Sequence, residues 1–364
     1  MRTVLFLFCV TFTFIACEKN EDNPPVVIDE KLYFPPVNSD TWQTTDPADL
    51  NWNTEAIPDL ITLLKNGGTR AFIVLKDGKI VIEEYFGKDL LGLTDFNKDK
   101  KWYWASAGKT LTAFAVGKAA EQGQLDINQK TSDFLGEGWT SLTSEEESKI
   151  TVWNQLTMTS GLDDKVQDNS VTTPDQLIFK ADSGTRWAYH NAPYTLLQSV
   201  ISNAVGQDYN DYFDEILTDK IGLDGYWQKL GNNHVYFSNA RSMARYGLLI
   251  LNNGTWDETE LLNADFVSDM VNTSQDLNKS YGYLWWLNGK ETYMLPGLQL
   301  TFQGKSTPNA PDDMFSGMGK NGQYLCVIPS QNMVLLRLGE NPDNSLVPIQ
   351  FIDDIWGVMN DILP

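Results

Sequence analysis

Histidine and cysteine are scarce in this chain of 364 residues, which contains only two histidines and three cysteines. Zinc sites draw on clusters of these two residue types, so we expect no metal site and no cofactor. If residues 1–16 are removed, Cys17 and Cys326 remain, which is too few for a disulfide framework. Stability must then come from a hydrophobic core, which a composition of 42% hydrophobic residues can supply.

Basic residues are few as well, because 27 Lys and Arg face 48 Asp and Glu and give a net charge of -21. This charge argues against nucleic acid as a partner and against electrostatic binding to anionic lipid. Neighbouring carboxylates such as Asp163 and Asp164 resemble a glycosidase pair. Charge runs of this kind are more often solvated faces, and we set the glycosidase aside.

No apolar run is long enough to span a bilayer comfortably. Residues 4–15 form a short apolar run after Arg2, which ends just before Cys17. This segment resembles a bacterial lipoprotein signal peptide over residues 1–16, cut so that Cys17 carries the lipid; an ordinary secretory signal is the alternative. Residues 17–30 are polar and acidic and predict a flexible tether. We therefore expect a lipid-anchored protein of the bacterial cell envelope, on the periplasmic face or the cell surface of the outer membrane.

The order of patterns along residues 31–364 predicts an α/β domain. Two β-rich runs surround Asp77-Gly78-Lys79, a strong hairpin signal, and strands return only near the end of the chain. The expected strands are 71–76, 80–86, 282–287, 291–294, 299–303, 323–328 and 333–339, and the expected helices include 54–65, 193–205, 208–217, 238–252 and 349–362. One antiparallel sheet, flanked by helices, would join both chain ends (about 31–105 and 281–364). A mainly helical region (about 106–280) would be inserted, with a cleft between them.

The segment Ser106-Ala107-Gly108-Lys109 contains the residues that most clearly indicate a catalytic function. Its hydroxyl and amine are three residues apart, a spacing that stacks two side chains on one helix face. A serine attacks only when a base takes its proton, and a lysine can be that base only when neutral. Burial can lower a lysine pKa from about 10.4 toward 7. The motif alone would occur about once by chance in a chain of this length, so other segments must support it.

Two later motifs follow in a fixed order. Tyr189-His190-Asn191 is the only Y-x-N sequence in the chain, and Lys320-Asn321-Gly322 immediately precedes an expected strand. Together with Ser106 and Lys109, they resemble the three motifs of the serine β-lactamase and penicillin-recognising enzyme superfamily. The segments 156–162, 240–247 and 281–286 are similar to its class C-like esterase and 6-aminohexanoate-oligomer hydrolase branch. Many relatives in this branch have histidine where Lys320 stands.

This resemblance implies a β-lactamase/transpeptidase-like fold and assigns roles to the motif residues. Ser106 would attack an acyl carbon, while Lys109 and Tyr189 would share the proton transfer, so that neither is singled out as the base. The oxyanion would lie between the backbone N–H groups of Ser106 and Gln323. The remaining substrate-binding candidates are Asn191, Lys320, Gly322 and His190. Trp285 and Trp286 are expected in the core and in the wall of the cleft.

We expect a serine hydrolase that cleaves a small ester or amide through an acyl-enzyme. It would be a carboxylesterase, an amidase or a β-lactamase-like enzyme. The alternative is a catalytically weak ligand- or penicillin-binding lipoprotein on the same scaffold. A Ser-His-Asp triad would have to use His190 or His234, and neither lies in a G-x-S-x-G context. The motifs do not choose among β-lactams, D-amino-acid peptides, esters and short amides.

Overall fold

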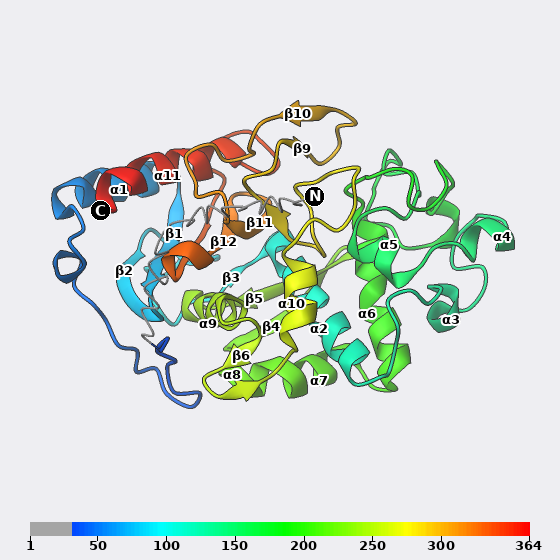
Figure 1. Ribbon diagram of the computed structural model, residues 1–364, viewed down its shortest axis with the longest axis horizontal. Helices are drawn as coiled ribbons and strands as arrows, with labels where there is room; N and C mark the ends of the chain where they lie inside the picture. Colours follow the sequence, from blue (N-terminus) through cyan, green and yellow to red (C-terminus); the bar gives the residue numbers. More distant parts are fainter. Residues whose placement is uncertain (1–30) are drawn as a thin grey trace, which may run out of the picture. The chain divides into compact units, whose positions relative to one another are not determined.

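A six-stranded antiparallel sheet forms the centre of the computed structural model, which describes residues 31–364 (Figure 1). The strand order is β2-β1-β13-β12-β11-β8, so β1 pairs directly with β13, the last strand of the chain, and β2 is the edge strand beside β1. The strands of this sheet are β1 (Thr69–Lys76), β2 (Lys79–Tyr85), β8 (Trp286–Leu287), β11 (Phe315–Gly319), β12 (Gln323–Ile328) and β13 (Met333–Gly339). The prediction of one sheet built from both chain ends is confirmed.

The β1–β2 hairpin turns at Asp77 and Gly78, which both have positive φ, 52° and 80°. A two-residue turn of this kind follows the right-handed twist of the strands and explains why Asp-Gly predicted it. A Cβ on Gly78 would lie 2.0 Å from the carbonyl oxygen of Tyr33. Only glycine therefore lets the N-terminal arm, residues 31–46, cross the hairpin at this point.

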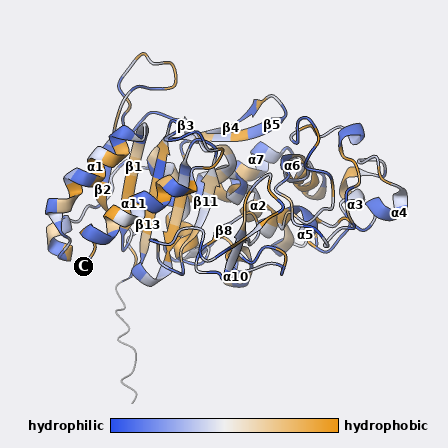
Figure 2. Cartoon of the chain, turned by 90° about the horizontal axis from the view of Figure 1, so that it is seen from above, coloured by the Kyte–Doolittle hydropathy of each residue, from blue (hydrophilic) through white to orange (hydrophobic). Residues whose placement is uncertain are grey.

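Helices cover both faces of the sheet. Helices α1 (Ile57–Asn66) and α11 (Ile349–Ile362) lie side by side on one face, and α9 (Ala240–Leu251) lies on the other (Figure 1). A Cβ on Gly247 of α9 would lie 2.6 Å from Val334, which shows how closely this helix approaches β13. Strands β1 and β13 are strongly hydrophobic, while α1 and α11 alternate between polar and apolar faces (Figure 2). This is the pattern expected of helices that cover a buried sheet.

The inserted region is mainly helical, as predicted. Its helices are α2 (Lys109–Glu121), α3 (Ser132–Leu135), α4 (Ser144–Glu147), α5 (Val152–Leu156), α6 (Asn191–Val205), α7 (Tyr209–Phe213), α8 (Asp219–Ile221) and α10 (Ala264–Met270). It also contains an unpredicted hairpin, β4 (Gly225–Leu230) and β5 (Asn233–Ser238), which pairs with β3 (Trp102–Tyr103). The remaining strands form two small hairpins, β6 (Thr255–Trp256) with β7 (Thr259–Glu260) and β9 (Thr292–Met294) with β10 (Thr301–Gln303).

In residues 31–364 no helix combines the length and the apolar character needed to cross a membrane. The predicted signal peptide (1–16), the tether (17–30) and Cys17 lie outside the described residues.

Candidate active site

Ser106 and Lys109 lie where a short 3₁₀ helix, η3 (Ala105–Gly108), runs into α2. The Lys109 Nζ atom is 3.2 Å from Ser106 Oγ and donates a 2.9 Å hydrogen bond to Asn191 Oδ1. Ala105, immediately before the serine, has φ 48°. This left-handed conformation costs a non-glycine residue about 1 to 2 kcal/mol, so the turn that presents Ser106 is strained. The predicted pairing of hydroxyl and amine is present in the structure.

The Lys109 side chain is held in an apolar environment. It is 3% exposed, and its Nζ atom lies 4.0 Å from the ring centroid of Tyr194 and 5.2 Å from that of Tyr189. Burial lowers the pKa of Lys109 to about 7. About half of the molecules would then carry a neutral amine at pH 7, which is the state that can accept a proton from Ser106.

Tyr189 differs from Lys109 in its protonation. Burial raises the pKa of Tyr189 well above its ordinary value, although a hydrogen bond with Ser106 lowers it in part. The phenol therefore keeps its proton at neutral pH and can donate it. The ring is fixed by stacking on Trp286 at 5.6 Å and by an edge contact with Tyr281 at 6.3 Å. Both tryptophan side chains are buried, and neither Trp285 nor Trp286 lines the cavity, so the expected cleft wall is formed by other residues.

Asn191, the first residue of α6, links Lys109 to a neighbouring loop. Its Oδ1 atom accepts from Lys109, and its Nδ2 atom donates to Asn169 Oδ1 at 3.0 Å. The backbone carbonyl of Asn169 also accepts from the Ala192 N–H at 2.9 Å. Because the two ends of an amide differ, the Asn169 acceptor orients the Asn191 oxygen toward the lysine.

A cavity of about 480 Å³ opens in front of these groups. Of the residues predicted from sequence, it is lined by Ser106, Lys109, Tyr189, Asn191 and Lys320. Sequence reasoning missed five polar residues that also line it: Tyr103, Asn169, Tyr194, Asn233 and His234. The Nδ1 atom of His234 lies 2.6 Å from Gln198 Oε1, so this ring nitrogen already has a partner outside the cavity.

Strand β11, which sequence reasoning did not predict, packs closely against the Ser106 segment. A Cβ on Gly319 would lie 2.5 Å from the carbonyl oxygen of Trp104, and one on Gly317 would lie 3.2 Å from that of Ala107. Strand β11 pairs with β8 only at Phe315 and Ser316. Its edge beyond Ser316 therefore has no partner strand on that side among residues 31–364 and packs against η3.

Gly322 and Gln323, predicted to bind substrate, do not line the cavity. Gln323 pairs with Gly319 across the β11–β12 ladder and is fully buried. Its side chain binds the end of β13, because Nε2 donates to the Gly339 carbonyl at 2.7 Å and Oε1 accepts from the Gly339 N–H at 2.9 Å. The Gly322 carbonyl accepts from Arg337 at 2.7 Å. Both residues therefore hold the β12–β13 pair together, and the role of the Gln323 N–H as an oxyanion donor stays a prediction.

His190 is also absent from the cavity. It is 2% exposed, and neither ring nitrogen has a hydrogen-bond partner among the described residues. Burial lowers its pKa to about 4, while Asp164 and Asp163 act in the opposite direction. The ring is neutral at pH 7 and lies behind the site, so its predicted contact with substrate is not supported by this position.

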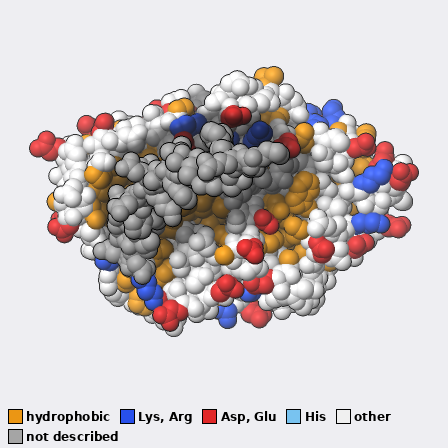
Figure 3. All heavy atoms as spheres, in the orientation of Figure 1, with side chains coloured by type: hydrophobic (Ala, Val, Ile, Leu, Met, Phe, Trp, Pro, Cys, Tyr) orange, Lys and Arg blue, Asp and Glu red, His pale blue; other side chains and the backbone are white. Residues whose placement is uncertain are grey.

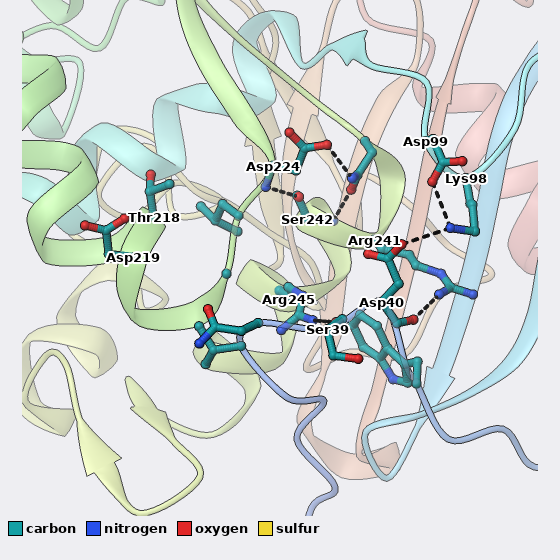
Figure 4. A pocket seen from close by; sticks show the side chains of 16 residues that line it. Ser39, Asp40, Lys98, Asp99, Thr218, Asp219, Asp224, Arg241, Ser242 and Arg245 are labelled. Atoms are coloured by element: carbon teal, nitrogen blue, oxygen red, sulfur yellow. Dashed lines mark hydrogen bonds and ion pairs between the residues drawn. The ribbon is translucent and has the colours of Figure 1, made fainter.

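A larger hollow of about 680 Å³ lies between the N-terminal arm and α9 (Figure 4). Its cations already have partners: Arg241 forms two 2.7 Å bonds with Glu83, and Lys98 lies 3.1 Å from Asp40. Arg245 donates to backbone carbonyls of the arm at 2.9 and 3.1 Å. These contacts attach the arm to the domain, and we assign the hollow to packing.

The Gly319→Ala change tests the close contact between β11 and η3. The added methyl would meet the Trp104 carbonyl oxygen at 2.5 Å, so β11 must shift. We expect a loss of about 1 to 3 kcal/mol in the free energy of unfolding and a loss of activity of roughly tenfold or more. Thermal unfolding and turnover measure these effects. Gly357→Ala on α11 is the control, because the added Cβ would lie 3.6 Å from its nearest neighbour; equal behaviour of the two variants would contradict the contact.

Known proteins are similar to this chain in sequence and in fold. The Beta-lactamase family matches residues 67–340. An uncharacterised protein of Alkalihalophilus pseudofirmus is 22% identical over 306 residues, which are 76% of this chain and 84% of that protein. A candidate penicillin-binding protein of Bacillus subtilis, PbpX, is 28% identical over 159 residues, 42% of this chain and 39% of its own length.

Among solved structures, a candidate 6-aminohexanoate-dimer hydrolase from Bacillus anthracis has a TM-score of 0.67 at 19% identity and covers 90% of this chain and 88% of its own. This likeness shows a shared fold. The family match extends from the residue after α1 to the residue after β13 and contains Ser106, Lys109, Tyr189, Asn191 and Lys320. The chain belongs to the Beta-lactamase family, within the superfamily of serine β-lactamases and penicillin-recognising enzymes.

Proposed function

We propose that this protein is a serine hydrolase that cleaves an ester or amide through an acyl-enzyme on Ser106. One observation carries the proposal: a buried lysine with a pKa of about 7 lies 3.2 Å from the serine hydroxyl. This is the arrangement of a nucleophile and its base. Packing alone does not require a buried lysine to lie beside a serine that lines a cavity.

The order of proton transfers follows from the two pKa shifts. Ser106 Oγ attacks the acyl carbon as Lys109 Nζ takes its proton, which forms the tetrahedral intermediate. Tyr189, which is protonated, donates to the leaving oxygen or nitrogen and regains a proton from Lys109. Water then attacks the acyl carbon of the ester on Ser106 while Lys109 accepts its proton. That proton passes to Ser106 Oγ as the Oγ–acyl bond breaks, and the acid leaves.

The oxyanion needs two donors that are fixed before the reaction starts. We assign one to the Ser106 N–H and the other to the backbone of β11 between Gly317 and Gly319. The support is the close packing of this strand edge on η3. In addition, β11 pairs with β8 only as far as Ser316, so the edge beyond that residue has no partner strand among residues 31–364. A backbone N–H on this edge is therefore not engaged by β8 and can donate to the acyl oxygen.

Covalent labelling of Ser106 is the direct test of this function. The purified protein is treated with a fluorophosphonate or a fluorescent penicillin, digested with trypsin and analysed by mass spectrometry. Cleavage after Lys101 and Lys109 releases a peptide of residues 102–109, in which Ser106 is the only serine. We expect the label on this peptide. Hydrolysis without any label there would place the reaction elsewhere.

A catalytically weak penicillin-binding protein is the second candidate, and the similarity to PbpX favours it. Both candidates form a covalent bond to Ser106, so the lifetime of that bond separates them. A hydrolase releases the acyl group within its turnover time, whereas a binding protein keeps it for much longer. Mass spectrometry of the intact protein at successive times after mixing measures this lifetime.

We predict measurable cleavage of short-chain p-nitrophenyl esters and only slow acylation by penicillins or a chromogenic cephalosporin.

Lys320 is exposed, and we expect it to dock acidic substrates through its charge. Lys320→Ala should then raise KM for a carboxylate-bearing ester severalfold more than for a neutral ester. Lys65→Ala on α1 removes the same charge away from the cavity and is the control. Equal effects of both variants would exclude docking at Lys320.

We also propose that a lipid on Cys17 anchors the protein in the cell envelope. Cys17→Ser should release it from the membrane fraction, because a serine at that position offers no thiol for acylation. Cell fractionation and immunoblotting measure the distribution, and Cys9→Ser serves as the control that keeps Cys17. Membrane retention of a signal-cleaved Cys17→Ser protein would show that another part of the chain provides the anchor.

A further inference from the structure

The mouth of the active-site cavity is bordered by exposed leucines. Leu230 and Leu346 line the cavity and are 48% and 60% exposed. Leu298 and Leu300, which are 42% and 60% exposed, closely follow Gly297, another lining residue. We call these four residues the leucine rim. Large aliphatic side chains left this accessible beside a reactive site indicate a surface for an apolar ligand.

The leucine rim comes from three separate segments of the chain. Leu230 ends β4, Leu346 precedes α11, and the other two lie between β9 and β10. Between them, the Gln299 side chain donates a 3.0 Å hydrogen bond to the Trp187 carbonyl. This bond directs Gln299 into the protein and leaves Leu298 and Leu300 exposed on either side of it.

Among the described residues, Lys109 and Lys320 are the only Lys, Arg, Asp or Glu that line the cavity. The chain has a net charge of -21, yet no Asp or Glu is among the described residues that line the cavity. Charged side chains of both signs gather at the α4 end of the molecule, while apolar side chains are exposed nearer the middle of this face (Figure 3). An apolar chain entering the cavity would therefore desolvate no lining carboxylate.

Resting on the hydrolase function proposed above, we propose that the substrate carries an unbranched aliphatic chain, which lies across the leucine rim while its ester or amide group meets Ser106. Trp285 and Trp286 do not line the cavity and so do not restrict the chain to a compact group. A fully buried methylene contributes about a fourfold gain in binding, and a half-buried one about twofold.

A series of p-nitrophenyl esters, from acetate to decanoate, tests this inference. Each ester is used below the concentration at which it aggregates, so that single molecules are compared. We expect kcat/KM to rise roughly tenfold or more from butanoate to octanoate, since four half-buried methylenes are added. A parallel series of alkyl acetates shows whether the chain belongs to the acyl or to the alcohol part. A flat profile in both series would overturn the proposal.

Variants of the leucine rim identify where the chain binds. Leu230→Ser combined with Leu346→Ser should reduce the preference for octanoate over butanoate by about fivefold or more, and this ratio is independent of a general loss of activity. The control combines Leu91→Ser with Leu93→Ser, which are 78% and 73% exposed and do not line the cavity. The control should keep the preference of the natural protein. A preference that survives the first pair, or that is lost equally in both, contradicts binding at the leucine rim.

Failure of this inference can be told apart from failure of the hydrolase function. If fluorophosphonate labels Ser106 but chain length has no effect, the hydrolase function stands and the role of the leucine rim falls. If Ser106 is not labelled and no ester is cleaved, the hydrolase function falls first. A preference that appears only with vesicles or aggregated substrate would assign the leucine rim to a lipid surface and overturn binding of a single chain.

Discussion

Ser106→Ala is expected to abolish turnover and acyl-enzyme formation while the protein stays folded. The change removes the attacking oxygen and almost no volume, and Lys109 keeps its 2.9 Å hydrogen bond to Asn191. Loss of a nucleophile in serine hydrolases lowers the rate by roughly 10³ to 10⁶-fold. Ester hydrolysis, labelling by fluorophosphonate and thermal unfolding together measure the three expectations.

Ser330→Ala is the matched control for this variant. Ser330 is exposed in the turn between β12 and β13 and loses the same hydroxyl, so turnover should be unchanged. Unaltered turnover by Ser106→Ala would end the assignment of Ser106 as nucleophile. Loss of activity accompanied by unfolding would require Ser106→Cys, which keeps a nucleophilic atom in nearly the same volume and should still be acylated.

Activity should depend on pH through Lys109, whose burial lowers its pKa to about 7. Below this pKa the lysine is protonated and cannot accept a proton from Ser106. The rate should therefore fall about tenfold per pH unit well below pH 7 and level off above it. Lys109→Arg should lose roughly 10³-fold or more at every pH between about 6 and 9, because an arginine does not lose its proton in this range.

Lys118→Arg on the same helix provides the control for the arginine variant. Lys118 pairs with Glu121 at 2.5 Å, and arginine can form the same ion pair. This variant should keep both the rate and its pH profile. A Lys109→Arg enzyme with most of its activity, or a wild-type profile without a break near pH 7, would refute the role of Lys109 as a base.

Most of the central sheet could be predicted from sequence because its strands are hydrophobic and bounded by turns. Strands β12 and β13 and helix α11 have the predicted bounds. Strand β11 was missed because Gly317 and Gly319 have low β-propensity and interrupt its pattern. The same two glycines allow β11 to approach the Ser106 segment closely. The residues that prevented the prediction of this strand are therefore the ones that its position in the site requires.

The unpredicted β4–β5 hairpin had a visible signal. Gly231 and Asn232 separate two runs rich in aromatic residues, and Tyr226 stacks on Phe237 across the strands at 5.6 Å. The prediction gave no strand to residues 218–237, which lie between two predicted helices, although this signal favours a hairpin. Its position matters for function, because the hairpin brings Leu230 and His234 to the cavity.

Only those site residues that belong to a sequence motif could be predicted. Two of the motifs contain Ser106, Lys109, Tyr189 and Asn191, and the structure brings these four side chains together. Asn169 does not belong to any such motif, and it reaches Asn191 through a loop. Contacts of this kind depend on the path of the loop in three dimensions, which a local pattern does not specify.

The pairing of β1 with β13 has a consequence for biosynthesis. Ile73 faces Leu336 in this ladder, so the sheet cannot be completed until nearly the whole chain has left the ribosome. Pairing across so long a separation is slow, because a large loop must close before any contact forms. Until then β1 and β2 form only a hairpin, which is marginal in water. A nascent chain that stays open for this long can still pass through a translocation channel, as the delivery to the cell envelope that we propose would require.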